Sequence, residues 1–223
     1  MSLCIERAEP MPVFIIKDKA ILFAHVPKTG GSSVERYLAG QGLTILHGDH
    51  RAAGLRCTPQ HLHAVPLAQL LEPAAMHLSF LIVRHPVSRI ASEYRYQMRK
   101  RNWLRDRLSF SQWLATAMAR RALDPWYRDN HFRPQHEFEL PGARVFRFEN
   151  GVDTCIAFLA GDLGTPPPPS QIREKPSPPL DFALLTRDLR LIERTYARDF
   201  GRYGYGLSRS ELLEAGLSAD MVP

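Results

Sequence analysis

Several short apolar runs along the chain have the length and composition of buried β-strands. Residues 20–26 (AILFAHV) and 80–84 (FLIVR) are apolar almost throughout, which is typical of strands covered on both faces. Shorter runs of the same character lie at residues 13–16, 43–46 and 144–148. The polar sequence Lys17-Asp18-Lys19 follows the first of these runs and predicts a turn into the next strand.

Apolar positions that recur every three or four residues predict helices between the strands. The first helix is expected to begin at Ser32 and Ser33, the second to span about residues 86–100, and the third to follow the capping box 109–112. A fourth is expected near residues 152–159, a fifth carries the apolar stripe Leu185, Leu189, Ile192 and Tyr196, and a small last one is expected at residues 210–215. Residues 48–60 and the proline-rich residues 165–179 predict irregular loops. The alternation of strands and helices predicts the α/β class, a three-layer α/β/α arrangement with a central parallel sheet.

The bulk composition fits one globular domain with an anionic partner. A chain of 223 residues is long enough for one sizeable core, so we expect a single domain 1–223, with its core at about 13–206 and a tail at 207–223. The formal charge of +6 favours nucleic acid, an anionic polysaccharide or a phosphorylated cofactor, and charge alone does not choose among them. The 3 cysteines do not have the spacing of metal ligands. No apolar run is long enough to predict a membrane span, and the first residues do not have the apolar region of a signal peptide. We therefore expect a soluble, cytoplasmic protein.

The segment 27–33 (PKTGGSS) joins the strongest predicted strand to the helix that follows it. Backbone N–H groups and the positive end of the helix dipole meet at such a junction, and two glycines allow a phosphate to approach the backbone. Lys28 adds a mobile positive charge. It precedes Gly30 and Gly31, whereas the lysine of the nucleotide-triphosphate P-loop follows the glycines, so the segment is not that motif. The phosphate-binding candidates are Pro27, Lys28, Thr29, Gly30, Gly31, Ser32 and Ser33; an ordinary strand-to-helix turn is the alternative.

A second anion site is predicted where the strand 80–84 runs into the helix from residue 86. Arg84 ends the strand, and Ser92 lies two helical turns further on. A planar guanidinium and a hydroxyl can hold one phosphate between them. A solvated basic helix is the alternative, but the combination with segment 27–33 suggests a nucleotide phosphorylated at two positions.

The sequence HVPKTGGSS resembles the 5′-phosphosulfate loop of the carbohydrate sulfotransferases, in the branch that holds the heparan sulfate uronosyl and glucosaminyl O-sulfotransferases. Arg84 and Ser92 match the 3′-phosphate motif of that family. The resemblance covers about residues 21–205 and implies a P-loop-NTPase-like sulfotransferase fold. It also implies the donor PAPS (3′-phosphoadenosine-5′-phosphosulfate), the product adenosine 3′,5′-bisphosphate and no metal. The lack of an anchor like that of Golgi members suggests a soluble bacterial relative.

Sulfuryl transfer to a hydroxyl needs a base, and a neutral histidine suits that task near pH 7. Residues 60–67 (QHLHAVPL) carry two histidines with i, i+2 spacing, which alone fits a metal pair or a solvated surface equally well. A metal is disfavoured because no third ligand of suitable spacing follows. The resemblance implies a catalytic histidine in a similar context. His63 matches this histidine best, and His61 is the alternative base or a helper. Lys28 is the other expected catalytic group.

The segment 130–136 (NHFRPQH) collects polar side chains around a proline. A similar segment lines the acceptor cleft of the family, which implies that Arg133 and Gln135 bind the acceptor. The alternative is a loop packed against Trp126 and Phe132.

These observations predict a PAPS-dependent sulfotransferase that acts on an acceptor hydroxyl, of a carbohydrate or a glycolipid, with an anionic glycan as one option. Nucleic acid is not an expected partner. Two other classes stay open: a nucleotide kinase or ATPase on a variant phosphate loop, for which Glu149 is the one candidate metal-holding acid, and a basic module that binds nucleotide or glycan without chemistry.

Overall fold

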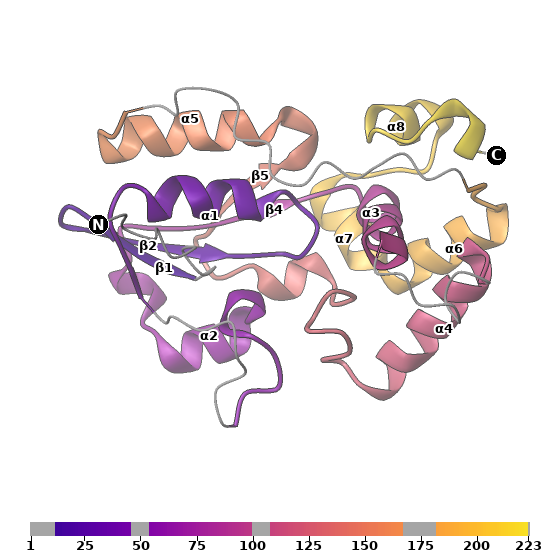
Figure 1. Ribbon diagram of the computed structural model, residues 1–223, viewed down its shortest axis with the longest axis horizontal. Coiled ribbons are helices and arrows are strands. Elements are labelled where there is room, and N and C mark those ends of the chain that lie inside the picture. Colours follow the sequence, from indigo (N-terminus) through magenta and orange to yellow (C-terminus); the bar gives the residue numbers. More distant parts are fainter. Residues whose placement is uncertain (1–11, 46–53, 100–107, 167–181, 223) are drawn as a thin grey trace, which may run out of the picture.

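The computed structural model describes residues 12–45, 54–99, 108–166 and 182–222. Its centre is a five-stranded sheet of order β3-β1-β2-β4-β5 (Figure 1). The strands are β1 (Val13–Ile16), β2 (Lys19–Ala24), β3 (Leu43–Ile45), β4 (Leu78–Val83) and β5 (Arg144–Arg147). All five were expected from the apolar runs.

The sheet is mixed, whereas the sequence suggested a parallel one. Strands β2, β4 and β5 are parallel, as expected, but β1 is antiparallel to both β2 and β3. The cause is the short turn between β1 and β2, in which Ile16 pairs with Lys19 and Lys17 takes a positive φ of 55°. A hairpin of this length can only reverse the chain, so the expected turn is confirmed and makes this pair antiparallel.

Helices cover both faces of the sheet, which confirms the α/β class (Figure 1). They are α1 (Gly31–Ala39), α2 (Ala64–Leu70), α3 (Pro86–Arg99), α4 (Phe110–Leu123), α5 (Val152–Leu163), α6 (Thr186–Thr195), α7 (Ala197–Tyr203) and α8 (Arg209–Glu214). Helices α1 and α5 pack on one face, where Phe23 and Phe80 stack at 4.6 Å between ring centroids. Helix α2 and the 3₁₀ helices Pro59–His61 and Gln135–Phe138 pack on the other face.

The alternation along the central strands explains the two-sided packing. In β4, Phe80 and Ile82 belong to the core under α1 and α5, whereas Leu81 and Val83 belong to the core on the opposite face. The same alternation holds along β2. Because successive side chains of a strand point to opposite faces, a strand buried on both sides must be apolar throughout.

A third core joins helices α3, α4, α6, α7 and α8 beyond the end of the sheet (Figure 1). Tyr94, Trp113 and Tyr196 lie in it, and Ser109 caps α4 with the expected capping box. The residues expected to form a tail contribute Leu212, Leu217, Met221 and Val222 to this core. The segment after residue 206 is therefore packed against the helices.

Two helical segments differ from those that the sequence predicted. Helix α2 was not expected, and the pattern Leu185 to Tyr196 forms α6 and then, after Tyr196, the separate helix α7. Parts of the two expected loops, at residues 48–53 and 167–179, lie outside the described residues. Within the described ranges, no helix is both long enough and apolar enough to cross a lipid bilayer.

Candidate active site

The loop after β2 ends in an uncapped helix N-terminus. Gly30 is the N-cap of α1, has a left-handed φ of 81°, and supplies no side-chain hydrogen bond to the helix. The first turn carries no acidic residue, and only the N–H of Ser33 is returned to the Gly30 carbonyl, at 3.1 Å. The early N–H groups of a helix have no acceptor within the helix, and they lie at the positive end of its dipole. This geometry suits an anion.

The two glycines of the loop are required by the protein's own packing. A Cβ on Gly30 would lie 2.7 Å from Val152 Cγ2, and one on Gly31 would collide with the imidazole of His25. These contacts give the two glycines a packing role beside the expected one of letting a phosphate approach the backbone. Thr29 is also committed internally, since its buried hydroxyl donates to the Val26 carbonyl at 2.8 Å. The groups that this loop can offer to an anion are its backbone N–H groups, the Lys28 ammonium and the half-buried Ser32, whereas Ser33 is buried.

Lys28 joins the loop to helix α3. It has a positive φ of 71°, and its Nζ lies 4.1 Å from the ring centroid of Tyr96. This cation–π contact holds the ammonium above the third helix. A left-handed backbone at a residue other than glycine is uncommon and tends to occur at functional positions.

Arg84 connects the second expected motif to the first. It follows β4, and its Nη1 donates to the Lys28 carbonyl at 3.3 Å. Its Nε donates to Ser88 Oγ at 2.9 Å, and its guanidinium lies 4.1 Å from the ring centroid of Phe148. Burial lowers the pKa of Arg84 to about 10, against the opposing charge of Glu149, so the side chain stays cationic at neutral pH.

The hydroxyl beside Arg84 belongs to Ser88. Ser92, the residue expected there, is buried one turn further along α3. Ser88 and Ser92 share a helix face because they are four residues apart. The structure thus adds Ser88 to the candidate phosphate-binding residues.

Gln135 and Arg133 make internal contacts. The Gln135 amide is fully buried, accepts from the Arg84 N–H and donates to the Arg84 carbonyl, both at 2.8 Å. The Arg133 guanidinium donates to Asn130 Oδ1 at 2.9 Å, to Glu137 and to the Pro125 carbonyl. These contacts favour a positioning role for both residues over the expected contact with an acceptor.

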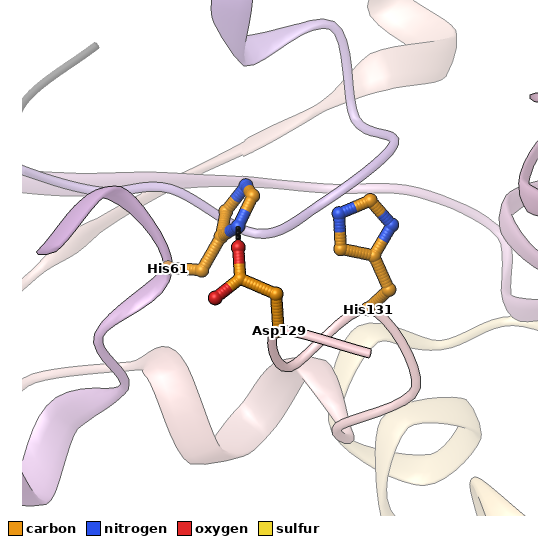
Figure 2. A group of neighbouring side chains, drawn as sticks. All are labelled: His61, Asp129 and His131. Atoms are coloured by element: carbon orange, nitrogen blue, oxygen red, sulfur yellow. Dashed lines mark hydrogen bonds and ion pairs between the residues drawn. The ribbon is translucent and has the colours of Figure 1, made fainter. Parts of the chain in front are cut away.

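His61 and His63 lie in different surroundings. His61 Nδ1 is 2.7 Å from Asp129 Oδ2, and His131 lies on the other side of Asp129 (Figure 2). The His61 ring meets those of His25 and His131 edge to face, at 5.3 and 5.0 Å between ring centroids. His63 packs against Trp126, at 4.9 Å between ring centroids, and its buried Nδ1 has no hydrogen-bond partner among the described residues. Burial lowers the pKa of each to about 4, and the charge of Arg133 adds to the effect at His63. Both rings are therefore neutral at pH 7.

A buried polar group behind the loop was not anticipated. His25 Nδ1 lies 2.7 Å from Glu35 Oε1, and the Gln60 amide donates to Glu35 Oε2 at 2.9 Å. Glu35 lies in the second turn of α1, and its hydrogen bond to Gln60 connects this helix to the segment that carries His61. The sequence did carry a signal of this group, because Glu35 lies on the apolar side of the helix that the pattern predicts.

Asp129 was not expected in the site, and His131 was included only as part of the segment 130–136. They belong to a turn in which Arg128, Asp129 and Asn130 all take left-handed φ values, of 56°, 58° and 62°. A left-handed conformation costs about 1–2 kcal/mol for a residue with a side chain, although Asp and Asn tolerate it best. Asn130 is fully buried and its amide donates to the His61 carbonyl at 2.8 Å, which fixes the turn against His61.

His131 completes the group around His61. Its Nδ1 lies 2.7 Å from Glu93 Oε2, and its ring stacks at 6.1 Å on Tyr96, the residue that carries the Lys28 ammonium. Lys28 and Arg84 are joined through the Lys28 carbonyl. A continuous set of contacts thus leads from the anion-binding loop to His61.

Among the described residues, one group has the composition of a metal site. His61, Asp129 and His131 each offer an atom, and the three atoms lie within 4.8 Å of one another. However, the His61 and Asp129 atoms are 2.7 Å apart, a hydrogen-bond distance. Two ligands of one zinc ion stand about 3.3 Å apart at normal bond lengths. The geometry therefore fits an Asp–His hydrogen bond better than a metal centre.

The fold is that of an α/β protein in which the glycine-containing loop after β2 and the basic side chain of Arg84 after β4 lie at the same edge of the sheet. Residues 11–151, more than half of the chain, match the model of the sulfotransferase family, and the chain belongs to that family. No curated protein and no solved structure matches the chain.

Proposed function

We propose that the protein transfers a sulfuryl group from PAPS to a hydroxyl of a carbohydrate or glycolipid acceptor. The observation that supports this proposal is the hydrogen bond from Arg84 to the Lys28 carbonyl, because the two segments that we expect to bind phosphate are in contact there. One site of this kind suits a nucleotide with phosphate groups at both its 5′ and 3′ positions. The family match supports sulfotransferase chemistry in general.

The loop residues have distinct roles in this reaction. The N–H groups of the first turn of α1 bind the 5′-phosphate, and Arg84 with Ser88 and Ser92 binds the 3′-phosphate. Lys28 stabilises the negative charge that develops on the oxygen between phosphorus and sulfur as the S–O bond breaks. These groups are held before the reaction begins, so little reorganisation is needed.

His61 is the base that the contacts support best. It receives the proton of the acceptor hydroxyl while the hydroxyl oxygen attacks sulfur, and adenosine 3′,5′-bisphosphate leaves. Its ring contacts His25, which lies against Gly31 of the loop, and His131, which is linked through Tyr96 to Lys28. His63, the better match by sequence, packs instead against Trp126 and Phe138 and is the second candidate.

The acceptor is proposed to be an anionic glycan or glycolipid because the chain is basic, with a formal charge of +6. The kinase alternative is weakened at Glu149, since its two oxygens accept from the His85 N–H at 2.7 Å and the Tyr205 hydroxyl at 3.1 Å.

The proposal is tested first by ligand-induced stabilisation. Adenosine 3′,5′-bisphosphate at a hundred times its dissociation constant should stabilise the fold by about 2.7 kcal/mol. AMP and ATP at equal concentration should give a much smaller rise in melting temperature. An equal rise with ATP and Mg²⁺ would favour a kinase, and no rise with any nucleotide would favour a glycan-binding module.

Activity is then measured as transfer of ³⁵S from labelled PAPS to a panel of desulfated and native glycans in the presence of a chelator. The rate of transfer is expected to be about 100-fold or more lower in Lys28→Ala than in the wild-type protein. Lys19→Ala is the matched control, because Lys19 lies at the start of β2 and its ammonium donates to the Asp162 carbonyl. Transfer at the wild-type rate in Lys28→Ala would contradict the proposed role of the loop.

A further inference from the structure

We propose that Asp129 is the positioning residue of the catalytic centre: it holds the Nδ1–H of His61, so that the neutral ring turns its Nε2 lone pair to the acceptor hydroxyl. This inference rests on the proposed function for the role of His61 as the base. The hydrogen bond on which it depends is a property of the protein alone and is tested separately.

The carboxylate of Asp129 is oriented by three contacts. Oδ1 accepts from the Thr58 N–H at 2.6 Å, and Oδ2 accepts from the Thr58 hydroxyl at 2.8 Å. Oδ2 also lies 2.7 Å from His61 Nδ1. Because hydrogen bonds to the charged form favour it, the pKa of Asp129 lies well below its usual range despite partial burial. Asp129 is therefore an acceptor only, and His61 must be the donor.

The backbone around Asp129 is fixed in a conformation that its sequence alone does not favour. Arg128, Asp129 and Asn130 are all left-handed, and the Asn130 side chain bonds the His61 carbonyl. The side-chain oxygen Oδ1 of Asn130 accepts a hydrogen bond from Arg133, whose side chain is also buried. A strained turn that persists under such constraint is typical of a functional site. Here its effect is to bring one carboxylate to one imidazole.

The other groups that face His61 leave this tautomer undisturbed. His25 and His131 are the neighbouring imidazoles, and each has its Nδ1 on its own carboxylate, Glu35 and Glu93 respectively. Asp129 is therefore the carboxylate that is hydrogen-bonded to His61 among the described residues. Figure 2 shows the second ring nitrogen of His61 on the side of the ring away from Asp129, so the carboxylate does not occupy it.

The test is the kinetics of Asp129→Asn. The asparagine oxygen can keep the bond from the Thr58 N–H, but its NH₂ group then faces His61 Nδ1 and forces the ring proton onto Nε2. We expect kcat to fall by about 100- to 10,000-fold, as in serine-protease triads whose histidine takes the wrong tautomer. The dissociation constant of adenosine 3′,5′-bisphosphate should change by less than about threefold, because Asp129 does not touch the phosphate loop.

The matched control is Asp162→Asn. Asp162 Oδ2 accepts from His77 Nε2 at 2.8 Å, so this variant removes an Asp–His hydrogen bond of the same kind away from the loop. It should keep wild-type kcat. Thr58→Val removes the hydroxyl that bonds Asp129 Oδ2 and lies 3.4 Å from His61 Nδ1, but keeps the Thr58 N–H bond to Oδ1, so it should give a smaller loss than Asp129→Asn.

The tautomer is read directly by long-range ¹H–¹⁵N NMR of the His61 ring in the wild-type protein at pH 7. The expected spectrum shows a protonated Nδ1 and an unprotonated Nε2, and Asp129→Asn should reverse the pattern. This measurement needs neither PAPS nor a hydroxyl acceptor. It therefore tests the Asp129–His61 hydrogen bond even if the protein does not catalyse the proposed sulfuryl transfer. If Asp129→Asn does not fold, the wild-type spectrum still decides.

Three results would overturn the inference. The first is wild-type kcat in a folded Asp129→Asn variant. The second is a His61 proton on Nε2 in the wild-type protein. The third is loss of activity on dialysis against a chelator with full recovery on addition of Zn²⁺ alone, which would assign His61, Asp129 and His131 to a metal site.

Discussion

The Nη1 atom of Arg84, just past the end of β4, donates a hydrogen bond to the backbone carbonyl of Lys28, 3.3 Å away in the loop after β2. The two strands are parallel neighbours, with Phe23 paired to Phe80 and Ala24 to Leu81. Their carboxyl ends therefore meet at the same edge of the sheet. This register is the reason that two motifs 56 residues apart form one site.

Replacing Lys28 by alanine should lower the turnover of sulfuryl transfer by about 100-fold or more, the usual cost of losing one preorganised donor to a developing negative charge. The free energy of unfolding should fall by no more than about 1 kcal/mol, the size of a cation–π contact such as that between Lys28 and Tyr96. Steady-state kinetics with PAPS, beside the urea denaturation curve of the same variant, separates the two effects. Unchanged turnover would remove Lys28 from the mechanism.

Replacing Gln135 by alanine should destabilise the fold by about 2–4 kcal/mol, because the N–H and the carbonyl of Arg84 would both lose their partners in a buried environment. It should also weaken binding of adenosine 3′,5′-bisphosphate, since Arg84 loses its anchor. Urea denaturation and calorimetric titration measure the two losses. Gln69→Ala, on the exposed side of α2, is the control and should cost less than 0.5 kcal/mol, or about the noise of the measurement. Were Gln135 an acceptor contact only, stability would not change.

Stability should fall as the pH is lowered from about 6.5 to about 4. Burial lowers the pKa values of His61 and His63 to about 4 in the folded protein, whereas both titrate near 6.5 when the chain is unfolded. Between these values the unfolded state binds more protons, so acidification favours unfolding, by up to about 3 kcal/mol for each histidine. Urea denaturation at pH 7.5, 6 and 5 measures the effect. A free energy of unfolding that stays constant across this range would show that neither ring is buried in the neutral form.

The variant His63→Phe separates the two histidines. The phenyl ring keeps the packing on Trp126 and removes the Nδ1 atom that is buried without a partner. The variant should lose part of the acid sensitivity and keep most of the activity, whereas His61→Phe should lose the activity. If His63→Phe is inactive and His61→Phe is active, His63 is the base, as the sequence comparison suggested.

Replacing Gly31 by alanine should be harmful because of His25. The new Cβ would strike the imidazole, and overpacking of this kind costs about 1–3 kcal/mol. The cost should shrink in a His25→Ala background, although that background loses the pairing with Glu35. A double-mutant cycle of unfolding free energies gives the interaction energy between positions 31 and 25. Purely additive effects would mean that the imidazole does not limit this position.

Much of the architecture was predictable because it depends on local patterns. Apolar runs located the five strands, and the capping box at Ser109 located α4. The direction of β1 depends on the geometry of a two-residue turn, and the helix α2 depends on burial of Leu67 against the sheet. Neither leaves a strong periodic signal in a short segment.

The candidate site was predictable only where one segment carries a complete motif. The loop at Lys28 and the strand end at Arg84 are of this kind. The partners of His61 are not, because Asp129 and His131 come from a turn 68 residues or more away along the chain and are brought in by tertiary packing. The roles expected for Arg133 and Gln135 could not be judged from sequence, since burial decides whether a polar side chain meets a ligand or the backbone.

The central claim is that one site binds both phosphate groups of an adenosine bisphosphate, and the dissociation constants of wild type and Arg84→Gln test it most directly. Calorimetric titration should show that wild type binds adenosine 3′,5′-bisphosphate at least about tenfold more tightly than AMP, a difference of about 1.4 kcal/mol. In Arg84→Gln the two nucleotides should bind equally. Equal binding by the wild-type protein, or a preference that survives in Arg84→Gln, would contradict the account.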